Sequence, residues 1–304
     1  CNKKVVKFLH KSTTIHKFQS VVERLTDTIL KSITSMGGIG YQTNYHFVII
    51  LLFFIISISS LKSFGQEKVP IIYSAGALFS ARETLYNYKI GDMLEKRGYK
   101  LIIPQRDGFL FANLAKELSD KLPPEDIIPA VNDIIYYLDI GFFINSCDVV
   151  LANLDEPVDE GVVVEMCYAK MMGKIVIGVR TDARSPYGEY NSPLNGIHFF
   201  PAYQCDGFFA YSVSEKNLTD EENQLNKMVD SLNLCIRNIL TKNKLKPLEN
   251  TIKTPTVQKT IDGANILFEG IPDINAEEGL KKISARYLEN RKKLDIRPEI
   301  IKGK

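Results

Sequence analysis

The sequence has few of the residues that bind transition metals or build disulfide frameworks. Its 304 residues include only four histidines and five cysteines. Neither CxxC spacing nor a neighbouring pair of histidines accompanies the cysteines, which stand at Cys1, Cys147, Cys167, Cys205 and Cys235. This pattern argues against a zinc site and against a disulfide framework. We therefore expect no metal in the functional site.

Other classes of function also lack support in the sequence. The 38 lysines and arginines nearly balance the 36 aspartates and glutamates, so composition gives no reason to expect a nucleic-acid partner. The glycine-rich segment GGIG at Gly37 follows no predicted strand, so it is not a phosphate-binding loop. A histidine-based hydrolase triad is not expected, because every histidine (His10, His16, His46, His198) lies outside the polar cluster predicted below.

The chain is composed like an ordinary globular protein, with 45% hydrophobic and 24% charged residues. We predict three parts. Residues 1–65 form a leader, residues 66–245 form an α/β domain, and residues 246–304 form a linker and a basic amphipathic helix.

The leader contains a dense apolar run, YHFVIILLFFIISISSL, at residues 45–61. At about fifteen residues its apolar part is shorter than the roughly 20 of a comfortable membrane-spanning helix and suits a signal peptide. Ser63 and Gly65 supply small residues before a cleavage point at Gln66. Three interpretations stay open: cleavage and export to the periplasm or beyond, a retained membrane anchor, or a mistranslated or fragmentary leader, in which case we expect a cytoplasmic protein.

From Val69 onward, short apolar segments alternate with segments of helical periodicity. The pattern predicts strands at 69–76, 99–108, 147–155 and 174–182, and helices at 83–98, 125–146, 160–172 and 219–240. Strands buried on both faces and alternating with helices are typical of a parallel sheet covered on both sides. We therefore predict a doubly wound, flavodoxin-like α/β fold.

The end of the chain loses this alternation. Residues 244–260 are polar and predict a linker, and residues 277–298 predict a basic amphipathic helix. Its apolar stripe comprises Leu280, Ile283, Tyr287 and Leu294. We expect this stripe to pack on the core or on a neighbouring subunit, in preference to a membrane surface or a nucleic acid.

In doubly wound sheets, ligands bind in the crevice outside the carboxyl ends of the strands. Polar residues follow each predicted strand: Tyr73 with 74–76, then 105–107, then 155–159, then Asp182 with Arg184. The helix that begins after Asp159 carries Glu165 inside a run of valine, methionine, cysteine and alanine. Helical side chains lean toward the N-terminus, so Glu165 is able to reach the crevice, where Tyr73 would hydrogen-bond it. A carboxylate held in that way suits a nucleophile.

Several of these segments together resemble the nucleoside 2-deoxyribosyltransferases. They are IIYSAGALF, PQRDG, YYLDIGFFINSCDVVLANLD, DEGVVVEMCYA with its D-x-G-x-x-x-E spacing, and SPLNGI, within residues 69–205. The resemblance implies a flavodoxin-like fold. It also implies transfer of 2-deoxyribose between nucleobases by double displacement, with 2′-deoxynucleosides and free nucleobases as substrates and no metal or organic cofactor.

The resemblance further implies roles for individual residues. Glu165 would attack the anomeric carbon and form a covalent deoxyribosyl-enzyme, with Tyr73 orienting it. Asp139 and Asp159 would handle the proton of the base and the polar atoms of the substrate. Asn195 would reach the 5′-hydroxyl of a sugar bound in the adjoining subunit, which makes a homo-oligomer part of the site. The resemblance adds Phe79, Gln105 and Asp107 as substrate contacts.

Structural alternatives exist for these residues. Glu165 would instead pair with a lysine or arginine, Asp139 would face solvent, Asp159 would only cap its helix, and Asp107 would pair with Arg106.

Two other functions stay open. One is an N-glycosidic hydrolase of deoxynucleosides or their 5′-monophosphates, for which Ser74, Arg82 and Arg184 are the candidate phosphate ligands. The other is a non-catalytic nucleotide-binding sensor module.

Overall fold

A computed structural model describes residues 68–188, 194, 196–211, 221–243 and 252–298. The described residues lie in one compact unit, Val69–Lys304. The predicted leader, Asn195 and Thr219, the residue predicted to start the fourth helix, lie outside them.

The described residues contain a five-stranded parallel sheet with the order β2-β1-β3-β4-β5. This order is that of flavodoxin, so the predicted fold class is confirmed. The chain order reverses between β1 and β3, which makes the carboxyl ends of these two strands the expected ligand position. The strands are β1 (Ile71–Ala75), β2 (Lys100–Ile102), β3 (Val149–Asn153), β4 (Ile175–Arg180) and β5 (Gly207–Ala210).

Alternate residues of the central strands enter two separate hydrophobic cores. Ile72 and Leu151 face one core, whereas Tyr73 and Val150 face the other. This alternation follows from the two-residue period of a strand. Burial on both faces explains why the sequence shows continuous apolar segments rather than alternating polarity.

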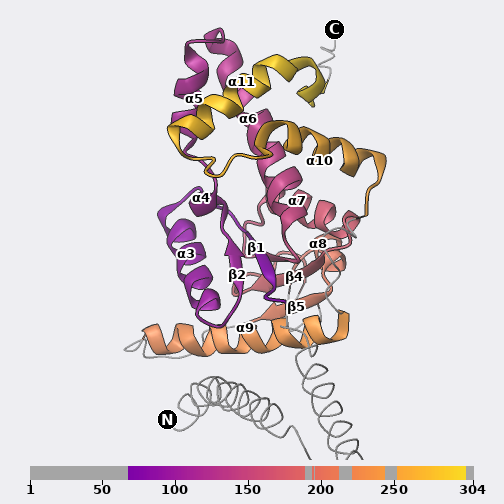
Figure 1. Ribbon diagram of the computed structural model, residues 1–304. Helices are drawn as coiled ribbons and strands as arrows, with labels where there is room; N and C mark the ends of the chain where they lie inside the picture. The colour runs from indigo at the N-terminus through magenta and orange to yellow at the C-terminus, as the bar shows by residue number, and fades with distance from the viewer. Residues whose placement is uncertain (1–67, 189–193, 195, 212–220, 244–251, 299–304) are drawn as a thin grey trace, which may run out of the picture. The chain divides into compact units, whose positions relative to one another are not determined.

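Two helices cover the first face of the sheet. They are α3 (Ala81–Glu95) and the long α9 (Glu221–Asn243), which pack on each other as well as on the strands (Figure 1). Helix α3 begins with a capping box, in which the Ser80 hydroxyl accepts from the Glu83 amide and the Glu83 carboxylate accepts from the Ser80 amide.

The opposite face is covered by α6 (Pro124–Tyr136), its direct π-helical continuation η1 (Tyr137–Ile144) and α7 (Glu160–Met171). The short α8 (Phe199–Gln204), which follows β4, packs on α7, and α5 (Phe111–Ser119), which follows β2, packs on α6. Periodicity predicted one helix over 125–146 but gave no sign of the π-helix. Such wider turns often mark functional positions.

The stretch Pro124–Ile144 is long and apolar enough to cross a membrane. More than half of its most apolar window is nevertheless buried within the protein. It lies between the sheet and the C-terminal helices, so its apolar character follows from contacts on several sides.

Two further helices near the C-terminus pack on this same stretch. They are α10 (Pro255–Phe268) and α11 (Glu277–Leu294) (Figure 1). The stripe predicted for α11, including Leu280 and Tyr287, is buried in the core. The prediction of a linker over 244–260 is wrong from Pro255 onward, because Thr254 caps a helix that starts there. The first turn of helix α10 is mostly polar, and for this reason the sequence pattern did not predict the helix.

Other predicted boundaries also change. The strand predicted over 99–108 ends at Ile102, because Pro104 starts the one-turn helix α4 (Pro104–Asp107). Gln105 and Asp107 therefore lie on a short helix and not on an extended rim. Helices α5 and α8 and the edge strand β5 were not predicted. The last two are only six and four residues long.

Candidate active site

A cavity of about 440 Å³ opens beside the carboxyl end of β1. Its apolar walls include Phe109, Leu110 and Leu138, and polar groups enter it from five different elements. These groups are Tyr73 from β1, Gln105 from α4, Asn132 and Asp139 from α6 and η1, and Asp159 and Glu165 from the start of α7. An apolar pocket with a few convergent polar groups is the usual form of a small-molecule site.

Glu165 lines this cavity and is held by Tyr73. The Tyr73 hydroxyl donates a hydrogen bond to Glu165 Oε1, with an O···O distance of 2.5 Å. Tyr73 itself is fully buried and packs against Phe143, so the donor has a fixed position. Within the described residues no lysine or arginine pairs with Glu165. The structural ion pair considered for Glu165 is therefore absent from the part of the chain that the structure describes.

Asp139 lies close enough to Glu165 and Tyr73 for its charge to act on both. Burial first, then the charge of Asp139, raises the pKa of Glu165 well above its usual value, whereas the hydrogen bond from Tyr73 opposes this rise. Burial raises the pKa of Asp139 to about 7. Two carboxyl groups that share a poorly solvated site do not both ionise readily, so the charge on one favours the protonated form of the other. Asp139 does not simply face solvent, which was its structural alternative.

Asp159 combines two structural features at the start of α7. It is the N-cap, and its Oδ1 accepts a hydrogen bond from the Val162 amide at 3.0 Å. A Cβ atom at Gly161 would lie 2.9 Å from this same oxygen, which explains the glycine in the D-x-G spacing. The predicted capping role is present, and the residue also lines the cavity.

Gln105 and Phe79 lie at the side and mouth of the cavity. The amide nitrogen of Gln105 donates to the Thr84 carbonyl at 3.3 Å, while its buried Oε1 has no hydrogen-bond partner among the described residues. A buried acceptor without a partner costs free energy unless a ligand satisfies it. The ring of Phe79 is 83% exposed and leaves a flat apolar surface at the opening.

Asp107 does not reach the cavity. Its Oδ2 accepts from the Ile103 amide at 2.7 Å, and its Oδ1 pairs with Arg106 Nε at 3.0 Å. Arg106 also bonds Glu95, so the group ties α4 to α3. The structural alternative holds for Asp107, and the prediction of a substrate contact is not supported.

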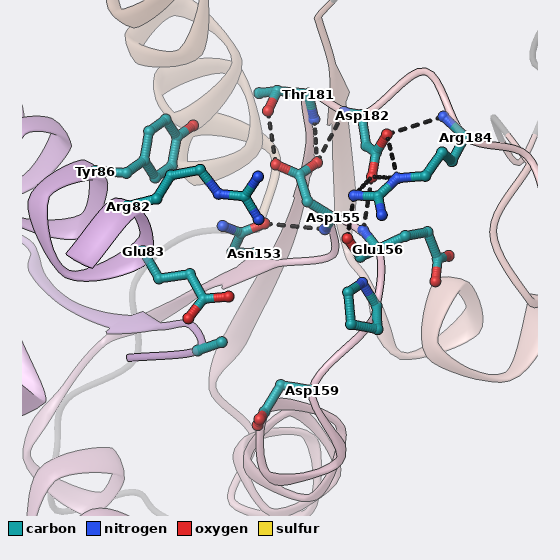
Figure 2. A pocket seen from close by; sticks show the side chains of 12 residues that line it. Arg82, Glu83, Tyr86, Asn153, Asp155, Glu156, Asp159, Thr181, Asp182 and Arg184 are labelled. Atoms are coloured by element: carbon teal, nitrogen blue, oxygen red, sulfur yellow. Dashed lines mark hydrogen bonds and ion pairs between the residues drawn. The ribbon is translucent and has the colours of Figure 1, made fainter. Parts of the chain in front are cut away.

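A second, smaller pocket of about 260 Å³ continues along the carboxyl edge of the sheet toward β3 and β4. It shares Ala77 and Asp159 with the first cavity. Figure 2 shows Asp155 near its centre, where the carboxylate accepts from the Thr181 amide and hydroxyl and from the Asp182 amide.

The three candidate phosphate ligands differ in their position and in their contacts at this second pocket. Arg184 is bound to Asp182, at 2.5 Å, and is committed to the pocket wall (Figure 2). Arg82 lines the pocket and makes no hydrogen bond or ion pair with the described residues. Ser74 lies within β1 and lines neither pocket. Arg82 is thus the one remaining candidate of the three.

Asn132 is a lining residue that sequence analysis missed. It lies seven residues before Asp139 on the continuous α6–η1 helix. This spacing is two turns, so the two side chains share one face of the helix. The sequence did contain a signal for Asn132. It is a polar residue in an apolar segment, and it lies seven positions from the predicted acid Asp139.

The model of one protein family matches residues 72–252, and its description is "Nucleoside 2-deoxyribosyltransferase". The chain belongs to this family. The match covers the whole sheet and the helices that carry Glu165 and Asp139. Helices α10 and α11 of this deoxyribosyltransferase-family protein lie beyond it. None of the curated proteins matches the chain.

Similar solved structures include three bacterial proteins. A conserved protein from Enterococcus faecalis is 20% identical, with a TM-score of 0.35, and the alignment covers 54% of this chain and 98% of that one. A 2-deoxyribosyltransferase from Bacillus psychrosaccharolyticus is 16% identical, with a TM-score of 0.31 and coverages of 46% and 85%. A CMP N-glycosidase from Clostridium botulinum is 15% identical, with a TM-score of 0.29 and coverages of 54% and 98%.

The family and the fold together indicate an enzyme that acts on N-glycosidic bonds. Members of this family act on nucleosides and nucleobases.

Proposed function

We propose that this protein transfers 2-deoxyribose from a 2′-deoxynucleoside to a free nucleobase, through a covalent intermediate on Glu165. The observation that carries the proposal is the hydrogen bond between Tyr73 and Glu165 at the wall of a ligand-sized cavity, with Asp139 beside it. The family match supports it independently.

In the first step a carboxylate oxygen of Glu165 forms a bond to C1′ of the sugar. The bond from C1′ to the base nitrogen breaks, and its electron pair leaves with the base. Asp139 donates its proton to the base, so that the base leaves neutral. The cationic sugar in the transition state is stabilised by the Glu165 carboxylate, as in retaining glycoside hydrolysis.

The second step reverses the first with a different base. Asp139, now ionised, removes a proton from the incoming base, whose nitrogen attacks C1′. The bond from C1′ to Glu165 breaks, and the electron pair returns to the carboxylate. The starting state needs one proton on the carboxyl pair, which matches the raised pKa of both groups.

The division of this proton follows from Tyr73. Its hydroxyl group stabilises negative charge on Glu165, whereas Asp139 has no such donor among the described residues. We therefore assign the proton to Asp139 and the negative charge to Glu165 in the reacting state. Tyr73 remains protonated, because burial and both carboxylates raise its pKa well above the usual value.

The remaining lining residues supply binding. The exposed ring of Phe79 stacks on the base. Gln105 Oε1, which has no partner among the described residues, accepts a hydrogen bond from the base, and Asp159 bonds the sugar hydroxyls. Asn195 of an adjoining subunit completes the sugar site in a homo-oligomer. Apolar side chains that surround the opening are available for such a contact: Phe79, Leu110 and Phe111 are all exposed.

The direct test is mass spectrometry after brief exposure to 2′-deoxyinosine. We expect a deoxyribosyl adduct on the peptide that contains Glu165, and none in Glu165→Gln. In turnover, added adenine is expected to yield deoxyadenosine together with hypoxanthine. No adduct and no turnover with any deoxynucleoside would reject the proposal and leave the non-catalytic sensor module.

A hydrolase is the second candidate, and Arg82 is the observation that favours testing it. Water would then replace the second base, and a guanidinium that has no partner among the described residues would suit a 5′-monophosphate. Hypoxanthine release that is independent of added adenine and forms no deoxyadenosine would identify hydrolysis. A preference for deoxyinosine 5′-monophosphate that disappears in Arg82→Ala would assign the phosphate contact.

A further inference from the structure

Helix α10 packs more extensively on η1 than any other pair of elements packs in the described residues. Glycines on both helices make this contact unusually close. A Cβ atom at Gly263 would lie 2.1 Å from Cε1 of Tyr137, and one at Gly141 would lie 2.6 Å from Cβ of Ala264 and 2.7 Å from the Thr260 carbonyl oxygen. Real Cβ atoms do not approach this closely, so the present distance between the helices requires glycine at both positions.

The same turn of η1 carries Asp139. Tyr137 and Gly141 each lie two residues from Asp139, which is about half a turn around the helix. Asp139 therefore faces the cavity while Tyr137 and Gly141 face α10. Any displacement of η1 toward or away from α10 also moves the Asp139 carboxyl relative to Glu165 on α7.

Helix α11 holds the remainder of this stretch. The Tyr287 hydroxyl donates to the buried Asp133 at 2.6 Å, the Tyr137 hydroxyl donates to the Leu294 carbonyl at 3.3 Å, and Arg291 pairs with Asp126 at 2.9 Å. These contacts attach α11 to both α6 and η1 (Figure 1).

We propose that α10 is a positioning element for the reaction, and that Gly263, through the ring of Tyr137, sets the place of Asp139 opposite Glu165. The inference rests on the proposed function, because it assigns a purpose to the placement of the acid. It gives a catalytic role to a segment beyond the residues that the family model matches.

The test compares Gly263→Ala with a matched core variant on the other face of the sheet, Val229→Ala in α9. Gly263→Ala adds one buried methyl group against η1, whereas Val229→Ala removes two buried methyl groups from the core on the other face and leaves η1 untouched. We expect Gly263→Ala to lower kcat about tenfold or more, with KM changed less than about threefold, because small displacements of a reacting group act mainly on the chemical step. Val229→Ala is expected to lower the Tm without this loss of kcat.

Rescue separates positioning from general damage. In Tyr137→Leu the ring that the new methyl group would contact is absent. Adding Gly263→Ala to this variant is therefore expected to lower kcat by less than about threefold. Should Gly263→Ala fail to fold, Phe268→Leu serves instead, because Phe268 contacts Phe142 of η1 with ring centroids 5.5 Å apart. We expect it to lower kcat more than Val229→Ala does.

A readout without turnover keeps this inference separate from the proposed function. NMR titration of ¹³C-labelled carboxyl groups measures the apparent pKa of Asp139. Its signal is assigned as the one that is missing in Asp139→Asn. Tyr73 and Glu165, which face Asp139, are kept unchanged in all variants. We expect an apparent pKa change of about half a unit or more in Gly263→Ala and none in Val229→Ala. Equal titration and equal kcat in all variants would overturn the inference. If the parent protein is inactive but Gly263→Ala still shifts the pKa of Asp139, the proposed function is rejected and the positioning role of α10 is kept.

Discussion

The hydroxyl oxygen of Tyr73 lies 2.5 Å from Oε1 of Glu165, so a buried residue of β1 holds the carboxylate of α7 in place. The two residues are 92 positions apart in the chain. They meet because α7 begins at the carboxyl end of the strands, where Tyr73 of β1 also lines the cavity. A hydrogen bond to a charged group contributes about 1.5–3 kcal/mol. Its loss has consequences for both rate and pH dependence.

Tyr73→Phe is expected to lower kcat/KM by roughly 10- to 100-fold, since the removed hydrogen bond stabilises charged Glu165. The hydrogen bond lowers the pKa of Glu165, so without it that pKa rises further. The acid limb of the pH profile, which requires ionised Glu165, therefore moves to higher pH. Tyr99→Phe is the control, because Tyr99 bonds Asn233 away from the cavity. An unshifted acid limb in Tyr73→Phe would contradict the assigned contact.

Asp139→Asn is expected to lose about 10²- to 10⁴-fold in kcat with ordinary deoxynucleosides, because it has no proton to give to the leaving base. A base that already carries a positive charge leaves without protonation. The loss with 7-methyl-2′-deoxyguanosine is therefore expected to be much smaller. Steady-state kinetics with both substrates checks this, and an equal loss for both would show that Asp139 is not the acid.

The pKa of Asp139 also predicts how stability depends on pH. Burial raises this pKa to about 7 in the folded protein, from about 4 in the unfolded chain. The contribution of the protonated group to stability is complete below the unfolded pKa and is lost as pH rises through the folded pKa. The substituted side chain in Asp139→Asn carries no charge at any pH, so this variant is expected to have a higher Tm than the parent at pH 8. The rise in Tm is about 2–4 °C or more for each kcal/mol of added unfolding free energy.

Thermal melts at pH 5 and pH 8 measure this difference. The advantage of Asp139→Asn is expected to shrink at pH 5, where the parent is protonated. Asp120→Asn, at an exposed position, serves as the control. A difference between parent and Asp139→Asn that does not change with pH would show that Asp139 is ionised in the folded protein throughout this range.

The parts of this site that were predictable from sequence depend on strand ends. Tyr73 and Asp159 follow from the rule that carboxyl ends of parallel strands meet, and Glu165 follows from a carboxylate out of place on an apolar helix. Gln105 and Asp107 were predicted together, yet one turn of helix α4 directs Gln105 into the cavity and Asp107 into an ion pair. Pro104 signals that turn, but spacing alone does not say which side chain faces inward.

The C-terminal helices were harder to predict for a physical reason. Periodicity reports which residues of a segment are apolar and not which partner covers them. The stripe of α11 was therefore predictable, but its contact with α6 through Asp133 was not. The contact of α10 with η1 depends on two glycines, Gly141 and Gly263, which weaken a helix prediction while permitting the closest packing.

Gln105 is expected to contribute more to binding than to stability. Its buried Oε1 has no partner among the described residues, a state that costs about 1–3 kcal/mol without ligand. Gln105→Leu removes this acceptor and keeps most of the volume, but it also removes the 3.3 Å hydrogen bond from Nε2 to the Thr84 carbonyl, so the Tm is expected to stay nearly unchanged. Affinity for deoxyadenosine is expected to fall about tenfold, measured by calorimetry with Glu165→Gln as the background to prevent turnover. Unchanged affinity would remove Gln105 from the base site.

A shared site makes a distinct prediction for mixtures of inactive variants. If Asn195 serves the sugar bound at Glu165 of an adjoining subunit, Glu165→Ala and Asn195→Ala are each inactive or nearly so. Refolding the two together in equal amounts forms mixed dimers in which one of the two sites has both native residues. Random pairing then restores about one quarter of the parental activity. Activity that stays at the level of the separate variants would place both residues in the site of a single subunit, and the exposed ring of Phe79 would then have to be covered by the substrate rather than by a second chain.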